Sequence, residues 1–222
     1  MSSSYRAVVI GATGAVGSAL THELVASPRC SHVTALVRRK SDLLGTAAKL
    51  SQHVVDFDRL EESTRAAAHG CEVAFCTMGV GQPRKVPREE QWRVDVELAA
   101  AFARGCRSAG VRHISLLTSV SARPTAGNYY LRVKGAAEEA VTQVGFARTS
   151  FFRPSLLVTR DVRYGLQDRL TQALFPWVAR LLPSRFRQIR VETLARAMRV
   201  NAERESDGIE FLHWSDFTAL AR

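Results

Sequence analysis

The chain has 222 residues, of which 46% are hydrophobic and 23% are charged, and its formal net charge is +10. These values are typical of a soluble globular protein, so we expect one domain over residues 1–222 with a substantial core. No apolar run approaches the roughly 20 residues that a membrane-spanning helix needs. The first residues lack the apolar segment of a secretory signal, which favours a cytoplasmic location.

The positive charge comes mainly from arginine and is scattered along the chain. Such an excess of positive charge can favour binding to nucleic acid, to a membrane surface or to an anionic ligand. Because the sequence has no basic tail, zinc-finger pattern or aromatic-interleaved basic strand, it argues against nucleic-acid binding. The four cysteines form no C-x-x-C pair and no histidine cluster accompanies them, so we expect reduced, partly buried thiols and no metal site. They are Cys30, Cys71, Cys76 and Cys106.

A glycine-rich turn near the N-terminus is the first functional motif. An apolar run at 5–10 predicts a strand, glycines follow at positions 11, 14 and 17, and a helical pattern covers 15–27. Such a turn lets the backbone and the helix N-terminus approach a diphosphate. Three glycines can also form a plain turn, but the flanking strand and helix favour a nucleotide site. The expected contacts are Gly11, Thr13, Gly14, Ala15, Val16 and Gly17.

Strand-like and helix-like segments alternate up to about residue 153. Apolar runs predict strands at 5–10, 32–37, 53–56, 72–77, 112–118 and 147–152. Helical patterns cover 15–27, 58–69, 89–109 and 128–144, and Gly70, Gly110 and Gly145 stand where helices would end. This alternation predicts an α/β fold: a doubly wound, mostly parallel sheet with helices on both faces, the Rossmann fold, with its ligand at the carboxyl ends of the strands.

The pattern changes after Pro154. We expect residues 1–153 to form the cofactor-binding core, and residues 154–222 to complete the sheet and to cover the substrate side as a short C-terminal extension. A helix is predicted at 190–203 and a last short strand at 208–212. An apolar stretch at 166–182, broken by Pro176, either packs on the core or lines an apolar pocket with Phe175, Trp177, Leu181 and Leu182.

Three cations, Arg38, Arg39 and Lys40, follow the second predicted strand. In dinucleotide-binding sheets an acidic residue at this strand end accepts a hydrogen bond from the ribose 2′-OH. Arginine instead offers bidentate bonds to a phosphate, so the sequence favours NADP(H) over NAD(H), with a solvated basic turn as the alternative. The next two strand ends add the expected cofactor residues Asp56 and Phe57, for the adenine, and Thr77, Met78 and Gly79.

A second motif combines a tyrosine and a lysine at helical spacing. Tyr130 and Lys134 are four residues apart, so they project from one face of the predicted helix 128–144. A lysine beside a tyrosine favours the phenolate, and the tyrosine can then exchange a proton with a carbonyl or alcohol oxygen. The fifth predicted strand ends in Thr118 and Ser119, whose hydroxyl can orient the substrate oxygen. Tyr129 lacks the spacing to the lysine and is expected to pack or to form a pocket wall.

The glycine turn, the serine after the fifth strand and Y-x-x-x-K together resemble the short-chain dehydrogenase/reductase family over about residues 5–160. Segments such as VTALVRRK, LLTSVSA and FRPSLL are similar to its atypical NADPH-binding branch related to the human Tat-interacting protein. The resemblance implies NADP(H) binding and a catalytic set of Ser119, Tyr130 and Lys134. It also implies that backbone around Arg153, Pro154, Ser155 and Leu156 borders the nicotinamide. The family's catalytic asparagine has no clear match; Asp95 occupies a comparable helical stretch.

Three functions remain open on this sequence. The first is an NADP(H)-dependent oxidoreductase that acts on a small carbonyl or alcohol. The second is an NADPH-binding regulatory or redox-sensing protein with a protein partner and little turnover. The third is an epimerase or dehydratase that works by transient oxidation. A monomer and a homodimer are both compatible with the fold.

Overall fold

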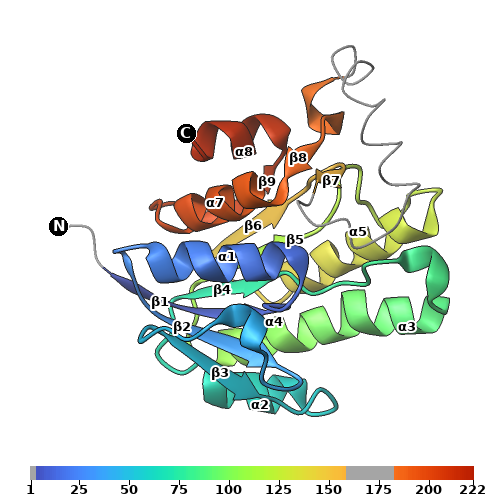
Figure 1. Cartoon of the computed structure of the whole chain (residues 1–222). Coiled ribbons are helices and arrows are strands. Elements are labelled where there is room, and N and C mark those ends of the chain that lie inside the picture. Colours follow the sequence, from blue (N-terminus) through green and yellow to red (C-terminus); the bar gives the residue numbers. More distant parts are fainter. Residues whose placement is uncertain (1–3, 159–182) are drawn as a thin grey trace.

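A computed structural model describes residues 4–158 and 183–222, so the apolar stretch predicted at 166–182 lies outside the described residues. Seven parallel strands form one sheet in the order β3-β2-β1-β4-β5-β6-β9 (Figure 1). Their bounds are β1 Tyr5–Ile10, β2 Cys30–Val37, β3 Leu50–Val54, β4 Val73–Cys76, β5 His113–Leu117, β6 Arg148–Phe152 and β9 Gly208–Leu212. The strand order runs outward in both directions from β1 and β4, which confirms the predicted doubly wound parallel sheet.

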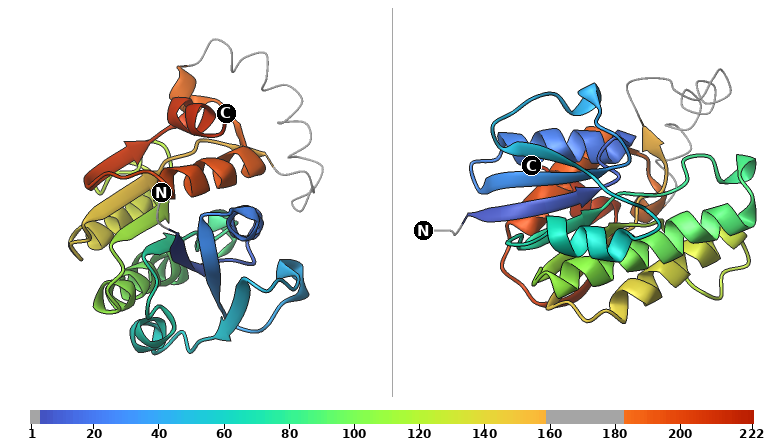
Figure 2. Two further views of the ribbon diagram at one scale, coloured as in Figure 1. Left: turned by 90° about the vertical axis from the view of Figure 1, so that its left-hand side faces the viewer. Right: turned by 90° about the horizontal axis from the view of Figure 1, so that it is seen from below.

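Helices cover both faces of the sheet, as the two views in Figure 2 also show. One face carries α1 Ala15–Ala26, α7 Val191–Ala202 and α8 Trp214–Leu220. The other carries α2 Leu60–Ala67, α3 Arg88–Trp92, α4 Leu98–Ser108 and α5 Tyr129–Thr142. Each layer buries its own apolar core, with Leu20 and Leu194 on the first side and Phe102 and Val133 on the second. The central strands are therefore buried on both faces, which explains their continuous apolar runs.

The third predicted strand was placed too late in the sequence. β3 covers Leu50–Val54, not 53–56, because it is the edge strand and starts with the half-buried polar residues Ser51 and Gln52 after Leu50, which give no apolar run. Asp56 and Phe57 consequently lie in the loop beyond the strand end. The predicted helix 58–69 is also shorter, since α2 covers Leu60–Ala67.

The predicted helix 89–109 is not one continuous α-helix. A π-helical turn, Arg93–Glu97, separates α3 from α4. A π turn adds one residue to the helical repeat and is frequent at functional sites. This turn buries Val94, Asp95 and Val96, so it places a carboxylate in the interior.

The described residues of the segment 154–222 form a second, small sheet and also add a strand and two helices to the main domain. Strands β7 Leu157–Val158 and β8 Ile189–Arg190, which the sequence did not predict, form a small parallel sheet just beyond β6. Helix α7 and strand β9 match the predicted 190–203 and 208–212, and β9 completes the sheet beside β6. The unpredicted helix α8 begins with a capping box in which Asp216 accepts from the His213 N–H.

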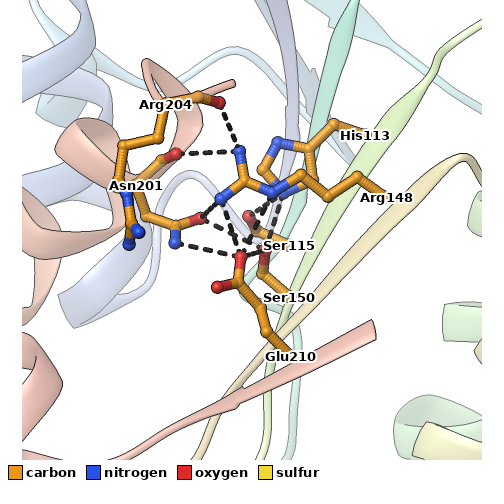
Figure 3. A network of polar contacts seen from close by, with 7 residues as sticks. All are labelled: His113, Ser115, Arg148, Ser150, Asn201, Arg204 and Glu210. Carbon is orange, nitrogen blue, oxygen red and sulfur yellow. Dashed lines mark hydrogen bonds and ion pairs between the residues drawn. The ribbon is translucent and has the colours of Figure 1, made fainter. Parts of the chain in front are cut away.

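A buried polar network fastens β9 and α7 to the amino end of β6 (Figure 3). The Arg148 guanidinium donates to Glu210 Oε1 at 2.7 Å and to the backbone oxygens of Asn201 and Arg204. Burial and the nearby charge of Arg148 lower the pKa of His113 to about 3, so its ring is neutral. The network satisfies the last carbonyls of α7 and lies at the sheet edge opposite the glycine turn.

Candidate functional site

The glycine turn forms a close-packed cradle between β1 and α1. Gly11 has a φ of +79°, which favours glycine, and a Cβ there would lie 2.6 Å from the Met78 nitrogen. A Cβ on Gly17 would overlap the Gly11 carbonyl oxygen and lie 2.6 Å from Thr77 Oγ1. At the N-cap Gly14, no described side chain caps the first-turn N–H groups of α1. The turn therefore offers backbone donors and a positive helix end to an anion.

The predicted residues after β4 lie directly against this cradle. Thr77 Oγ1 donates to the Ile10 carbonyl at 3.0 Å, which ties the end of β4 to the end of β1. Gly79 is exposed, and a Cβ there would lie 2.9 Å from Asp95 Oδ1 and 3.0 Å from Lys134 Nζ. The structure therefore brings Thr77, Met78 and Gly79 together with the glycine turn at the carboxyl edge, where the strand order reverses.

The cations predicted to bind a 2′-phosphate follow the neighbouring strand β2. Arg38, Arg39 and Lys40 are all exposed, and none of the three forms an ion pair within the described chain. The Arg38 guanidinium lies 4.8 Å from the centre of the Phe57 ring. Asp56 is exposed, and its carboxylate accepts from the Asp58 N–H at 2.9 Å. Arg38 and Phe57 thus contact each other at the carboxyl edge of the sheet, where β2 lies next to β1.

Lys134 is buried and held by a carboxylate. Its ammonium donates to Asp95 Oδ1 at 3.1 Å, and the same oxygen accepts from the Val80 N–H at 3.2 Å. Burial opposes the charge of the lysine, but Asp95 and the nearby Tyr130 outweigh it, so the pKa of Lys134 is raised. Asp95 Oδ2 is buried and has no hydrogen-bond partner among the described residues. Asp95 was only a tentative match in the sequence, because the π turn that buries it leaves no periodic signal.

Tyr130 and Lys134 lie one turn apart on α5, with the lysine nitrogen 5.9 Å from the centre of the tyrosine ring. Asn128 caps this helix by accepting from the Leu131 N–H. Ser119 follows β5 and is buried, and its carbonyl accepts from the Ala122 N–H. Its neighbour Val120 donates to the Pro154 carbonyl at 2.9 Å. The predicted catalytic residues therefore share the carboxyl edge of the sheet with the cradle.

A residue that the sequence reading did not single out, Glu138, connects three segments at this edge. It accepts from Thr118 Oγ1 at 2.7 Å and binds both Nε and Nη2 of Arg153. Arg153 also lies 4.1 Å from the centre of the Phe211 ring. The Arg153 side chain is therefore occupied within the protein, so only its backbone is available to a cofactor. The spacing Lys134–Glu138, another four residues, is the signal that could have revealed this role.

The remaining observations concern the cysteines, the possible metal ligands, the character of the helices and a second pocket. The four cysteines are free thiols, all buried. The described histidine, cysteine and acidic side chains form no group of three or more that could hold a metal ion. None of the helices in the described ranges combines the length and apolar character that crossing a membrane requires. A separate pocket of about 580 Å³, lined by Tyr5 and Arg148 among others, lies at the opposite, amino edge of the sheet.

The glycine cradle, the open N-terminus of α1 and the strand reversal define a parallel α/β nucleotide-binding domain. A model of the NAD(P)H-binding family matches residues 11–171. The chain therefore belongs to the NAD(P)H-binding family. It is 34% identical to Protein HTATIP2 of Rattus norvegicus over 173 residues, which are 78% of this chain and 67% of that protein. Over 171 residues it is 26% identical to Protein FMP52, mitochondrial, of Candida albicans, covering 76% and 75% of the two chains.

Two solved structures of other proteins share the fold. MoeE5 in complex with UDP-glucuronic acid and NAD aligns with a TM-score of 0.74 at 21% identity and covers 94% of this chain and 76% of that one. Vestitone reductase from alfalfa aligns with a TM-score of 0.68 at 22% identity, with the same coverage. At these identities the likeness concerns the fold. The chain thus has an NAD(P)H-binding fold and homology to HTATIP2.

Proposed function

We propose that this protein is an NADP(H)-dependent oxidoreductase that interconverts a small carbonyl compound and its alcohol, as atypical short-chain dehydrogenase/reductases do. The observation that carries the proposal is the placement of Tyr130 and Lys134 one helical turn apart, at the same sheet edge as the glycine cradle. Two features of the glycine cradle fit a bound dinucleotide. The glycines leave room where Cβ atoms would collide, and the first turn of α1 presents backbone donors.

In this mechanism Lys134 supplies a fixed positive charge. Its raised pKa keeps the ammonium charged at neutral pH, because Asp95 balances the cost of burial. A positive charge at this place stabilises the negative charge that develops on an oxygen while a proton is transferred. Tyr130 can therefore donate its proton to the oxygen of a carbonyl that is being reduced, or accept one from an alcohol that is being oxidised.

Ser119 orients the substrate oxygen toward Tyr130. It is suited to this role because the hydrogen bonds of Val120 and Ala122 fix the backbone on both sides of the turn that follows it. Lys134 would also hold the nicotinamide ribose, and the backbone from Arg153 to Leu156 would border the ring. The nicotinamide, when bound, supplies or accepts the hydride.

The preference for NADP(H) over NAD(H) is part of the proposal. Arg38, Arg39 and Lys40 replace the acidic residue that would bind a free 2′-OH, and they carry no internal carboxylate partner in the described chain. The Arg38 guanidinium, which lies over Phe57, offers a flat cationic surface for the adenine and paired N–H donors for the 2′-phosphate on the adenosine ribose. The structurally similar MoeE5 was solved in complex with NAD, so the affinities of this protein for NADPH and NADH have to be compared directly.

The test is a fluorescence titration of the protein with NADPH and NADH, followed by a panel of aldehydes and ketones at saturating NADPH. Tighter binding of NADPH and oxidation of NADPH by at least one carbonyl class support the proposal. Saturable NADPH binding with no turnover across the panel, together with a partner protein captured only when NADPH is present, favours the regulatory alternative. Turnover without net NADPH oxidation favours the epimerase or dehydratase.

We also propose a cytoplasmic location, with the protein acting as a monomer or homodimer. Because several fungal relatives are named mitochondrial, the location needs a direct measurement. Cell fractionation with a cytosolic and a mitochondrial marker decides between the two compartments, and sedimentation of the purified protein gives its oligomeric state.

A further inference from the structure

An excess of unpaired positive charge surrounds the candidate substrate side. It lies in three described segments: 79–90 after β4, 119–132 after β5, and 183–190, where Ile189 donates to the Leu156 carbonyl at 2.9 Å. Their only carboxylates are Glu89 and Glu90. Among the described side chains there, seven cations form no ion pair: Lys85, Arg88, Arg123, Arg132, Arg185, Arg187 and Arg190.

Arginines elsewhere in the described chain are often compensated. Arg59, Arg104 and Arg199, on or beside the helices, each pair with a glutamate at 2.5–3.1 Å. The network at the amino edge likewise pairs Arg148 with Glu210. In the three described segments on the substrate side, by contrast, seven unpaired cations stand against only two carboxylates, so the net charge there is positive and its field attracts anions.

Two of these cations converge on one aromatic ring next to the proposed acid/base. The guanidinium of Arg88 lies 5.0 Å from the centre of the Tyr129 ring, and that of Arg132 lies 5.6 Å from it. Tyr129 is the residue directly before Tyr130, at the start of α5. The two charges thus come from different segments and meet beside the active-site helix.

The hydrogen bonds around Tyr129 and Arg132 do not neutralise the charges of Arg88 and Arg132. Tyr129 Oη donates to the Arg88 carbonyl at 2.8 Å, which fixes the ring against the start of α3. Arg132 Nη1 donates to the carbonyls of Ala126 and Gly127 at 2.9 and 2.8 Å. All of these acceptors are neutral, and the N-terminus of α5 adds a positive partial charge at the same place.

We propose that the substrate carries an anionic group, a carboxylate or a phosphate, which Arg88 and Arg132 bind beside Tyr129 while its carbonyl or alcohol reacts at Tyr130. This inference rests on the proposed oxidoreductase function and names its substrate class. Arginine suits the role, because its planar fork matches both oxyanions and it stays charged at all relevant pH values. The other cations at this edge raise the local concentration of such a substrate.

Matched pairs of probes test the proposal with the full chain. 4-Formylbenzoate and 4-formylbenzamide have nearly the same shape and differ in charge, and straight-chain oxo acids with their amides extend the set. Turnover is followed with NADPH, and binding of the corresponding hydroxy acids and hydroxy amides to NADP⁺-loaded protein is followed by calorimetry. We expect the acids to have KM and Kd values about tenfold lower than the amides, a ratio that shrinks as salt is raised.

Variants then assign the effect to the pair of arginines. In Arg88→Gln the acid/amide ratio should fall about threefold or more, and in the double variant with Arg132→Gln it should approach one. Arg88 makes no side-chain hydrogen bond within the described chain, so the single variant keeps the fold even if Arg132→Gln loosens the loop it holds. Arg112→Gln, an unpaired arginine at the amino edge, is the matched control and should keep the wild-type ratio.

The outcomes separate this inference from the proposed function. Preferential binding of the acids without any turnover supports the anion site and counts against the oxidoreductase. Equal KM and Kd values for acids and amides overturn the anion site, even if both are reduced rapidly. A preference that persists in the double variant but disappears in Arg112→Gln also overturns it.

Discussion

The ammonium nitrogen of Lys134 lies 3.1 Å from Asp95 Oδ1, and both side chains are buried. The contact joins α5 to the π turn between α3 and α4. Gly79 completes the arrangement, since a Cβ there would lie 2.9 Å from Asp95 Oδ1. The charge next to Tyr130 thus depends on a carboxylate that a regular α-helix of the same length would not direct to this place.

Replacing Asp95 by asparagine should leave Lys134 with a buried charge and no counter-charge. The pKa of Lys134 should fall, because Asp95 is what raises it. We expect a loss of about 2–4 kcal/mol in the free energy of unfolding, measured with urea. The control is Asp58→Asn, since Asp58 is 81% exposed in its pair with Arg93 and should cost less than about 1 kcal/mol. If both substitutions lowered the free energy of unfolding equally, the proposed role of the buried Lys134–Asp95 pair would be contradicted.

Replacing Arg38 by alanine should change the preference between cofactors. Loss of the guanidinium over Phe57 removes a charge-assisted contact to a 2′-phosphate, so the Kd for NADPH should rise about tenfold or more. The Kd for NADH should change little, and Arg65→Ala, another exposed arginine, should alter neither. If the two cofactors bind the wild type equally well, the role of Arg38 is refuted.

Replacing Glu138 by glutamine should loosen the connection between α5 and the ends of β5 and β6. It removes the charge that holds both nitrogens of Arg153 and weakens the bond from Thr118. We expect about 2 kcal/mol less stability and a kcat that falls more than the Kd for NADPH rises, because Glu138 positions the site without touching the substrate. Glu139→Gln, on the exposed side of the same helix, is the control. A kcat unchanged in Glu138→Gln would show that this contact serves stability alone.

His113 should make folding stability depend on pH. Its pKa is lowered from 6.5 to about 3 in the fold, so below pH 6.5 the unfolded chain takes up a proton that the folded chain does not. Stability is therefore lost as the pH falls from 6.5 toward 3, by at most about 1.4 kcal/mol per pH unit for this one proton. His113→Gln should flatten the dependence between about pH 5 and 6.5, where the carboxylate of Glu210 stays ionised because hydrogen bonds lower its pKa. The exposed His69→Gln should leave the slope unchanged, and an unaltered slope in His113→Gln would refute this assignment.

Much of the architecture could be predicted from local patterns. The central strands are apolar on both faces, so β1, β4, β5 and β6 were predicted within one or two residues at each end. The start of the edge strand β3 was missed, because Ser51 and Gln52 are polar residues that an edge tolerates. The strands β7 and β8 have only two residues each, which is too short for any periodicity to register.

The parts of the site that lie close together in the sequence could be predicted. The glycine turn and the Tyr130–Lys134 pair are local, so both could be located from the chain alone. The partners Asp95 and Glu138 depend on tertiary contacts between residues up to 39 positions apart, as in the bond from Lys134 to Asp95. The meeting of Arg88 and Arg132 on Tyr129 was hidden for the same reason, since only folding brings α3 beside α5.

The most direct test of the account is the rate of NADPH oxidation by Tyr130→Phe with a carbonyl substrate of the wild type. Phenylalanine keeps the ring and removes the proton that reduction requires, so we expect kcat to fall by about 10² or more while NADPH binds as in the wild type. Tyr129→Phe, which keeps the proposed acid/base, should lose far less. Undiminished turnover in Tyr130→Phe, with normal cofactor binding, would contradict the proposed mechanism.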